Sequence, residues 1–264
     1  MGKLAVEINE ARVEPGTLKL WWLGQAGFAF KTVSGLVVYV DPYLSDSAKR
    51  LHGFRRLSLT PLEAEETKVD LVVLTHEHTD HLDPDALPVI AAKNPNCVFA
   101  APSGCNDGLD TAGIAAKRRL LLEPGKSVAF RGVTVHGTPA DHLPHSPTAL
   151  ALALDLEGVK VMVSGDSSWR PDFFAPLYRL GLDVVIPCIN GGFGNMGHTD
   201  AARLVGEAGA PIAIPCHFWT FAEQGAGDPM GFLNACLREA PKVQAMLLEP
   251  GECLTVTART GKND

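Results

Sequence analysis

The sequence lacks the features of membrane, secreted and disulfide-rich proteins. The longest apolar run, Ala149–Leu154, ends at Asp155 and is far shorter than the ~20 residues of a membrane span. The first residues, Met1–Glu7, contain no apolar core of a signal peptide. The cysteines occur singly, without a Cys-x-x-Cys pair: Cys97, Cys105, Cys188, Cys216, Cys236 and Cys253. We therefore expect a cytoplasmic protein with buried free thiols and no membrane partner.

Basic residues are also scarce. There are 23 Lys and Arg against 30 Asp and Glu, which gives a formal charge of -7. This balance argues against a nucleic-acid partner, because neutralising phosphates requires a basic surface. It leaves room for a local pocket that binds a small anionic substrate. Cations in the segment 49–56 could form such a pocket or simply be a solvated face.

The chain is 264 residues long, and 46% of it is hydrophobic, enough to bury a sizeable core. No linker rich in Gly, Pro or Ser divides it, so we expect a single domain over 1–264. The pattern predicts a lead-in without secondary structure at 1–17, and a helix that Asp83 caps and Pro84 begins. Strands are expected at 18–23, 28–32, 36–40, 69–74, 97–101, 127–130, 133–136, 148–154, 159–163, 184–188, 212–216, 243–248 and 253–257. Further helical segments are expected at 61–66, 106–112, 172–180, 200–208 and 229–239. The economical arrangement of these elements is two sheets with helices outside.

The stretch richest in chemistry is 75–81, Thr-His-Glu-His-Thr-Asp-His, which follows the apolar strand 69–74. Imidazole and carboxylate groups at this density are ligands for borderline divalent ions such as Zn²⁺ or Mn²⁺. The spacing lets His76 and His78 hold one ion while Asp80 and His81 turn toward a second. A helical His-Glu-x-x-His zinc site is excluded, because Asp80 stands where the second histidine should be. The alternative is a His-rich surface turn.

Other candidate ligands lie at the ends of later strands. Asp166 follows the strand 159–163, and His217 follows the strand 212–216. His136, His142 and His145 lie at or beyond the end of a predicted hairpin. Side chains at the carboxyl ends of separate strands are typical of open α/β sites. Taken singly, Asp166 could equally be a turn residue and His217 a packed core histidine.

These segments together resemble the metallo-β-lactamase superfamily. The resemblance covers about Val13 to Pro229. It is carried by the His-x-His-x-Asp-His motif, by Trp21–Phe28, by the Asp41-Pro42 turn, and by the segments 164–167 and 214–217. The last four are similar to the branch that contains the L-ascorbate-6-phosphate lactonases. The resemblance implies a four-layer αββα sandwich with the site along one edge.

The resemblance also implies a ligand set. His76, His78 and His142 would hold one ion, with His145 as the alternative third histidine. Asp80, His81 and His217 would hold the other ion, and Asp166 would bridge the two. The lactonases carry an acidic residue at the position of His142, so the substrate and the choice among Zn, Mn and Fe stay open.

A metal-bridging hydroxide would then open a small lactone or ester, for example a phosphorylated sugar lactone. Alternatives are a phosphodiesterase acting on lipid or nucleotide and a mononuclear iron persulfide dioxygenase. We expect Asp80 to double as a proton shuttle. His198, in the Gly-rich rim 190–198, would contact the substrate or simply begin the next helix. Substrate-binding residues are expected at four positions: Asn190, Phe193, Phe218 and Trp219. The sequence leaves open whether the protein forms a homo-oligomer.

Overall fold

The computed structural model describes residues 2–222 and 227–259, and within them two seven-stranded sheets pack face to face. The remaining positions of the predicted 1–264 domain lie outside the described residues. The first sheet has the order β14 (Cys253–Thr257), β1 (Thr17–Gly24), β2 (Gly27–Lys31), β3 (Val37–Val40), β4 (Leu71–Val73), β5 (Val98–Ala101), β6 (Arg119–Leu121). The second has the order β13 (Gln244–Ala245), β12 (Ile212–Ala213), β11 (Val184–Ile186), β10 (Val159–Val163), β9 (Leu150–Leu156), β8 (Val133–Pro139), β7 (Ser127–Phe130).

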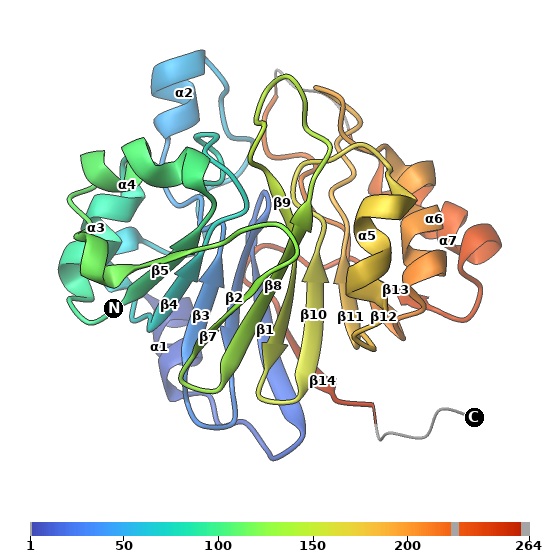
Figure 1. Cartoon of the computed structure of the whole chain (residues 1–264), viewed down its shortest axis with the longest axis horizontal. Coiled ribbons are helices and arrows are strands. Elements are labelled where there is room, and N and C mark those ends of the chain that lie inside the picture. Colours follow the sequence, from blue (N-terminus) through green and yellow to red (C-terminus); the bar gives the residue numbers. More distant parts are fainter. Residues whose placement is uncertain (1, 223–226, 260–264) are drawn as a thin grey trace.

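Helices cover the outer face of each sheet. On the first sheet these are α1 (Lys3–Glu10), α3 (Ala86–Lys93) and α4 (Asn106–Thr111), and on the second α5 (Pro171–Tyr178), α6 (His198–Ala208) and α7 (Pro229–Glu239). Figure 1 shows the two groups of helices flanking the paired sheets. The six-residue helix α2 (Ser47–His52) stands apart, above the sheet edge. The predicted single-domain αββα sandwich is confirmed.

Side-chain alternation divides the first sheet between two cores. In β1, Leu18, Leu20 and Trp22 join the cluster shared with the second sheet, whereas Trp21 and Leu23 join the cluster under the outer helices. The period of two residues in a strand requires this division when both faces are buried. Every residue from Leu20 to Thr32 is buried for this reason.

Ten strands run in the same direction, because β5 and β6 continue parallel to β4 and β13 continues parallel to β12. Seven of the ten lead into loops that gather at one edge of the sandwich. β1 and β3 both pair antiparallel to β2, and β4 is parallel to β3. In the other sheet, β8 and β10 both pair antiparallel to β9, and β11 and β12 continue parallel to β10. The loops that follow these seven strands are therefore neighbours in space.

The structure departs from the sequence prediction at its short elements. Residues 3–10 form α1 rather than an irregular lead-in, and bury Leu4, Ala5 and Ile8. Neither α2 nor β6 was predicted. The three short 3₁₀ turns cover Ala64–Glu66, Ser103–Cys105 and Ala116–Arg118.

The predicted cap of the third helix was also misplaced. Helix α3 begins at Ala86 with Asp85 at the N-cap position, not at Asp83-Pro84. The Asp83 carboxylate is buried and still accepts hydrogen bonds from the Asp85 and Ala86 N–H groups, at 3.0 and 3.2 Å. It therefore satisfies helix donors from a position just outside the helix.

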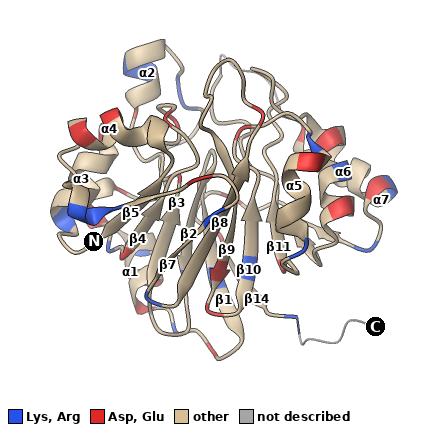
Figure 2. Ribbon diagram, in the orientation of Figure 1, with Lys and Arg blue, Asp and Glu red and all other residues tan. Residues whose placement is uncertain are grey.

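Charged residues occur both on the outer helices and in the loops. Figure 2 marks acidic and basic residues interspersed on α6 and α7, and acidic ones on α4 and α5. No helix among the described residues is long and apolar enough to cross a membrane. The six cysteines are unpaired, and five of them are buried, as predicted.

We predict that Asp83→Ala lowers the free energy of unfolding by about 3 kcal/mol, because it leaves several buried donors without an acceptor. Besides the two helix donors, the carboxylate accepts from the Leu44 N–H and from the Ser45 and Ser47 hydroxyls. Urea denaturation measures the change. The control is Asp85→Ala, which breaks the exposed pair with Arg50 and should cost less than about 1 kcal/mol. Equal effects of the two substitutions would contradict the interpretation.

Candidate metal centre

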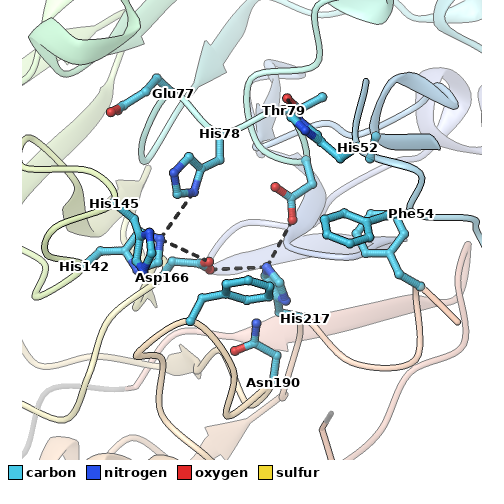
Figure 3. A pocket seen from close by; sticks show the side chains of 14 residues that line it. His52, Phe54, Glu77, His78, Thr79, His142, His145, Asp166, Asn190 and His217 are labelled. Carbon is cyan, nitrogen blue, oxygen red and sulfur yellow. Dashed lines mark hydrogen bonds and ion pairs between the residues drawn. The ribbon is translucent and has the colours of Figure 1, made fainter. Parts of the chain in front are cut away.

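The candidate site lies where the seven parallel-running strands end. His76 follows β4, His142 follows β8, Asp166 follows β10, and His217 follows β12. All four side chains are at least nine-tenths buried. Figure 3 shows that His78, His142, Asp166 and His217 point toward one another from separate loops. The structure therefore brings together the seven predicted ligands.

Three imidazoles form the first donor set. The Nε2 atom of His76 is 3.0 Å from Nδ1 of His78, and that Nδ1 atom is 3.3 Å from Nε2 of His142. Together with an oxygen of Asp166, these nitrogens lie within 4.8 Å of one another. Such spacing suits a single ion at their centre, since Zn–N bonds are roughly 2.0–2.1 Å long. His145, the alternative third ligand, is an exposed neighbour whose ring centroid lies 5.5 Å from that of His142.

A carboxylate and two imidazoles form the second donor set. The Oδ2 atom of Asp80 lies 3.3 Å from Nε2 of His217 and 3.9 Å from Nε2 of His81. One atom from each of these three residues falls within the same 4.8 Å limit. Asp80 gives this set a carboxylate of its own, in addition to Asp166.

Asp166 lies between the two sets. Its Oδ2 atom faces His142, at 3.8 Å from Nε2, whereas its Oδ1 atom is 3.4 Å from Nε2 of both His81 and His217. One carboxylate oxygen is thus directed to each set. This is the geometry that a carboxylate shared by two cations would need.

The protonation of two imidazoles in the first set, and of Asp166, fits a bound cation. Burial lowers the pKa of His76 well below its usual value and that of His142 to about 4. Both are therefore neutral, the form that a metal ligand requires. For Asp166 burial alone would raise the pKa, but His217 and His81 outweigh it and hold that pKa well below the usual range.

Two buried donor atoms directed into the cluster have no hydrogen-bond partner, Nε2 of His81 and Oδ1 of Asp166. Unpaired buried polar atoms are costly, and a cation between them would satisfy both. Burial lowers the pKa of His81, yet the carboxylates of Asp166, Asp41 and Asp80 raise it well above its usual value. Positive charge is therefore favoured at this point. We conclude that the residues present fit a divalent-metal centre.

Three polar residues that the sequence did not identify hold the donors in place. Asp41 accepts a hydrogen bond from Nδ1 of His81 at 2.8 Å, which leaves Nε2 free for the site. Gln25 donates from Nε2 to Oδ2 of Asp80 at 2.6 Å, and Asn195 donates to Oδ2 of Asp166 at 2.7 Å. All three are buried. The available signal was a polar residue directly after a strand for Asp41 and Gln25; Asn195 gave none.

Backbone conformation brings two of the ligand loops together. Gly165 has φ +58°, and a Cβ there would lie 2.7 Å from the carbonyl oxygen of Leu150 and 3.3 Å from Cβ of Thr75. Only glycine lets the loop after β10 approach the loop after β4 this closely. His217 has φ +61° although it carries a side chain. Such strain is common at functional sites.

A cavity of about 450 Å³ opens over the donors. Asn190 and Phe193, two of the predicted substrate-binding residues, line it. The sequence did not single out His52, whose Nε2 is 3.0 Å from the Thr79 hydroxyl, or Phe54. The full lining is Ala48, His52, Phe54, Glu77, His78, Thr79, Asp80, His142, His145, Asp166, Asn190, Phe193, His217 and Phe221.

Three predicted site residues lie elsewhere. Phe218 stacks on Trp22 in the core, with ring centroids 5.1 Å apart, and Trp219 is 60% exposed. Both flank a crevice of only about 10 Å³ beside His217. The predicted strand 212–216 ends at Ala213, and the left-handed conformations of His217 and Trp219 turn alternate side chains away from the cavity. His198 begins α6, where its Cδ2 atom would lie 3.0 Å from a Cβ placed on Gly231 of α7.

Comparison with known proteins agrees with this architecture. The model of the beta-lactamase superfamily domain matches residues 19–217, which include all seven donors. A UPF0173 metal-dependent hydrolase of Cupriavidus necator is 32% identical over 90% of this chain and 85% of its own length. A probable L-ascorbate-6-phosphate lactonase of Escherichia coli is 29% identical, over 51% of this chain and 44% of the lactonase.

A solved structure shares the fold. It is a metallo hydrolase from the archaeon Ignicoccus hospitalis, with a TM-score of 0.68 and 24% identity, over 90% of this chain and 98% of that one. The similarity to the metal-dependent hydrolase of Cupriavidus necator, together with the two donor sets, indicates a metal-dependent hydrolase. The chain belongs to the metallo-β-lactamase superfamily, among its UPF0173 metal-dependent hydrolases.

We predict that Asp41→Asn weakens metal binding by about 10–100-fold, because an amide no longer holds Nδ1–H of His81 as a carboxylate does. Metal per chain after dialysis against a graded chelator, measured by mass spectrometry, gives the affinity. The matched control is Asp183→Asn, which changes another buried carboxylate, one that accepts from the N–H groups of Lys160 and Arg259. Unchanged metal affinity in Asp41→Asn would show that the contact does not support the site.

Proposed function

We propose that this protein is a dinuclear hydrolase, using Zn²⁺ or Mn²⁺, that opens a small lactone or carboxylic ester. The observation that carries the proposal is the placing of Asp166, whose two oxygens face two complete donor sets. A mononuclear site would need only one set. The metal-dependent hydrolase relatives support hydrolysis, and the partial similarity to the probable lactonase supports a carbonyl substrate.

The chemistry of such a centre is general. When bound, divalent cations supply a hydroxide nucleophile at neutral pH and polarise the oxygen of the bond to be cleaved. His76, His78 and His142 would hold one ion, and Asp80, His81 and His217 the other. Asp166 would be shared between them. The preference for Zn²⁺ or Mn²⁺ follows from a set of imidazole and carboxylate donors.

Asp80 has two parts in the proposal. Burial would raise its pKa, but His81 and His217 hold it well below the usual range, so that Asp80 is ionised at neutral pH. We assign it mainly as a ligand, held by Gln25, and secondarily as the carrier of a proton to the departing group. Asn190 and Phe193 are the predicted substrate-binding residues that reach the cavity. The proposal assigns no role to His198.

We expect His78→Ala to reduce metal-dependent hydrolysis by well over 100-fold. Removing a metal ligand should have a larger effect than the roughly 10–100-fold loss that follows when a residue hydrogen-bonded to a ligand is replaced. The measurement is kcat/KM with Zn²⁺ or Mn²⁺ added, together with metal per chain. His136→Ala is the control, since His136 is a half-buried histidine within β8. Near-normal turnover of purified His78→Ala would overturn the mechanism.

A substrate screen tests the reaction class. Lactones, carboxylic esters and phosphodiesters are offered to protein loaded separately with Zn²⁺ and Mn²⁺. Hydrolysis of lactones or esters, with two metal ions per chain, supports the proposal. Turnover of phosphodiesters alone, or one iron per chain with no hydrolysis, contradicts it and favours the phosphodiesterase or the dioxygenase.

A further inference from the structure

We propose that the substrate is uncharged and carries an apolar hydrocarbon or aryl group, which binds against Phe54 and Phe221. This inference rests on the proposed function, and it replaces the anionic substrate that the sequence suggested. It arises from the wall of the cavity that provides no metal ligand.

That wall is an aromatic cluster built outside the strand ends. Phe54 and Phe221 contact each other with ring centroids 5.8 Å apart, and Tyr43 supports Phe221 at 5.7 Å. Phe221 is 4% exposed and Phe54 is half-buried, and both line the cavity. In Figure 3, Phe54 lies across the site from His142 and His145, with Asp166 and His217 between them.

The position of Phe54 is fixed by the end of α2. Gly53 terminates this helix with φ +79°, the left-handed conformation that commonly ends helices. The next N–H, that of Phe54, donates to the Ala48 carbonyl at 3.3 Å. Ala48, in the first turn of α2, also lines the cavity. This helix and the residue after its C-cap therefore place a small side chain and a phenyl ring side by side.

The described lining contains no Lys or Arg. Nearby cations have partners of their own: Arg50 pairs with Asp85 at 2.6 Å, and Arg170 pairs with Asp141 and Asp172. Arg56 lies over the Tyr43 ring, 3.9 Å from its centroid, and donates to the Ser45 carbonyl. Lys49 and Arg55 line a separate cavity of about 490 Å³.

A phosphate or carboxylate away from the metals would therefore lack the cationic partner that such groups normally use. Apart from the carboxylate of Glu77, which accepts from the Ser146 hydroxyl, the polar groups around the donors are neutral hydrogen-bonding groups, such as Asn190, or imidazoles, such as His52 and His145. They suit the oxygens of an ester or lactone. Apolar walls with a few polar groups are the usual design of sites for uncharged small molecules.

The test compares two esters on the metal-loaded protein. These are 4-nitrophenyl butyrate and mono-(4-nitrophenyl) succinate, whose acyl chains both have four carbons and differ in a terminal methyl or carboxylate group. We expect kcat/KM to be at least about tenfold higher for the butyrate, the effect of a matched apolar contact. The lactone pair δ-decalactone and 6-phosphoglucono-δ-lactone should show the same order.

Variants locate the preference. Phe54→Ala should raise KM for the butyrate about tenfold, while kcat and metal content stay unchanged. Phe54→Leu, which replaces it if the alanine variant fails to fold, should raise KM by a smaller factor. Phe54→Arg should reverse or abolish the preference for the butyrate. The matched control is Leu57→Arg, which adds the same charge at an exposed leucine outside the cavity lining.

Binding to metal-free protein gives a readout that does not depend on activity. N-(4-nitrophenyl)butanamide should bind about tenfold more tightly than N-succinyl-4-nitroanilide in calorimetry, with a negative heat-capacity change, and Phe54→Ala should remove the difference. Preference for the succinate or the phosphorylated lactone would overturn the inference and leave the proposed function standing. Failure of the loaded protein to hydrolyse any ester or lactone would overturn both.

Discussion

The constraint on which this molecule depends is the common direction of seven strands. Because β1, β3, β4, β8, β10, β11 and β12 all end at one edge, residues far apart in sequence meet there. The same pairing that buries two hydrophobic cores also fixes the positions of the strand ends that carry the donors. Stability and site geometry therefore come from the same register. A shift of β10 by one residue would reverse the direction of Asp166 and remove the carboxylate from both donor sets.

Burying the carboxylates and imidazoles of this centre without bound cations costs free energy. The carboxylates of Asp80, Asp166 and Asp41 lie close to the imidazoles of the site. The Nε2 atoms of His81 and His217 are each 3.4 Å from Oδ1 of Asp166, and Nε2 of His76 is 3.0 Å from Nδ1 of His78. The protein offsets part of this cost with neutral or charged partners, namely Gln25 for Asp80, Asn195 for Asp166, and His81 for Asp41. The oxygen and nitrogen left unpaired are those that face the interior of the cluster. Uncompensated buried charge is unfavourable, so the arrangement favours cation binding even before any substrate enters.

The sequence located the cluster of donor side chains where potential metal ligands stand out from an apolar neighbourhood. His76, His78, Asp80 and His81 follow an apolar strand, and no packing requirement explains four such residues there. The contacts of Gln25, Asp41 and Asn195 with the donors could not be predicted, although Gln25 and Asp41 lie in segments that carry the resemblance, because a single polar residue in a turn has an ordinary local explanation. Their roles depend on which strand ends are neighbours. Helix α1 was missed because Gly2 at its N-cap supplies no side-chain cap and its first turn has no acidic residue, so the usual start signals are absent. Phe218 was misplaced because strand alternation does not continue through the left-handed residues His217 and Trp219.

The division between strand ends and α2 separates the chemistry from substrate selection. The donors sit on loops that each follow a strand of the sheets, whereas Phe54 sits beyond a six-residue helix outside them. Among the described contacts between these two parts, the hydrogen bond between His52 and Thr79 joins α2 to the metal loop. Phe54 itself contacts aromatic rings, not donors. Replacing Phe54 can therefore change which molecules fit while the metal ligands keep their positions. A change in substrate preference in such a variant can then be assigned to the aromatic wall of the cavity and not to the metal.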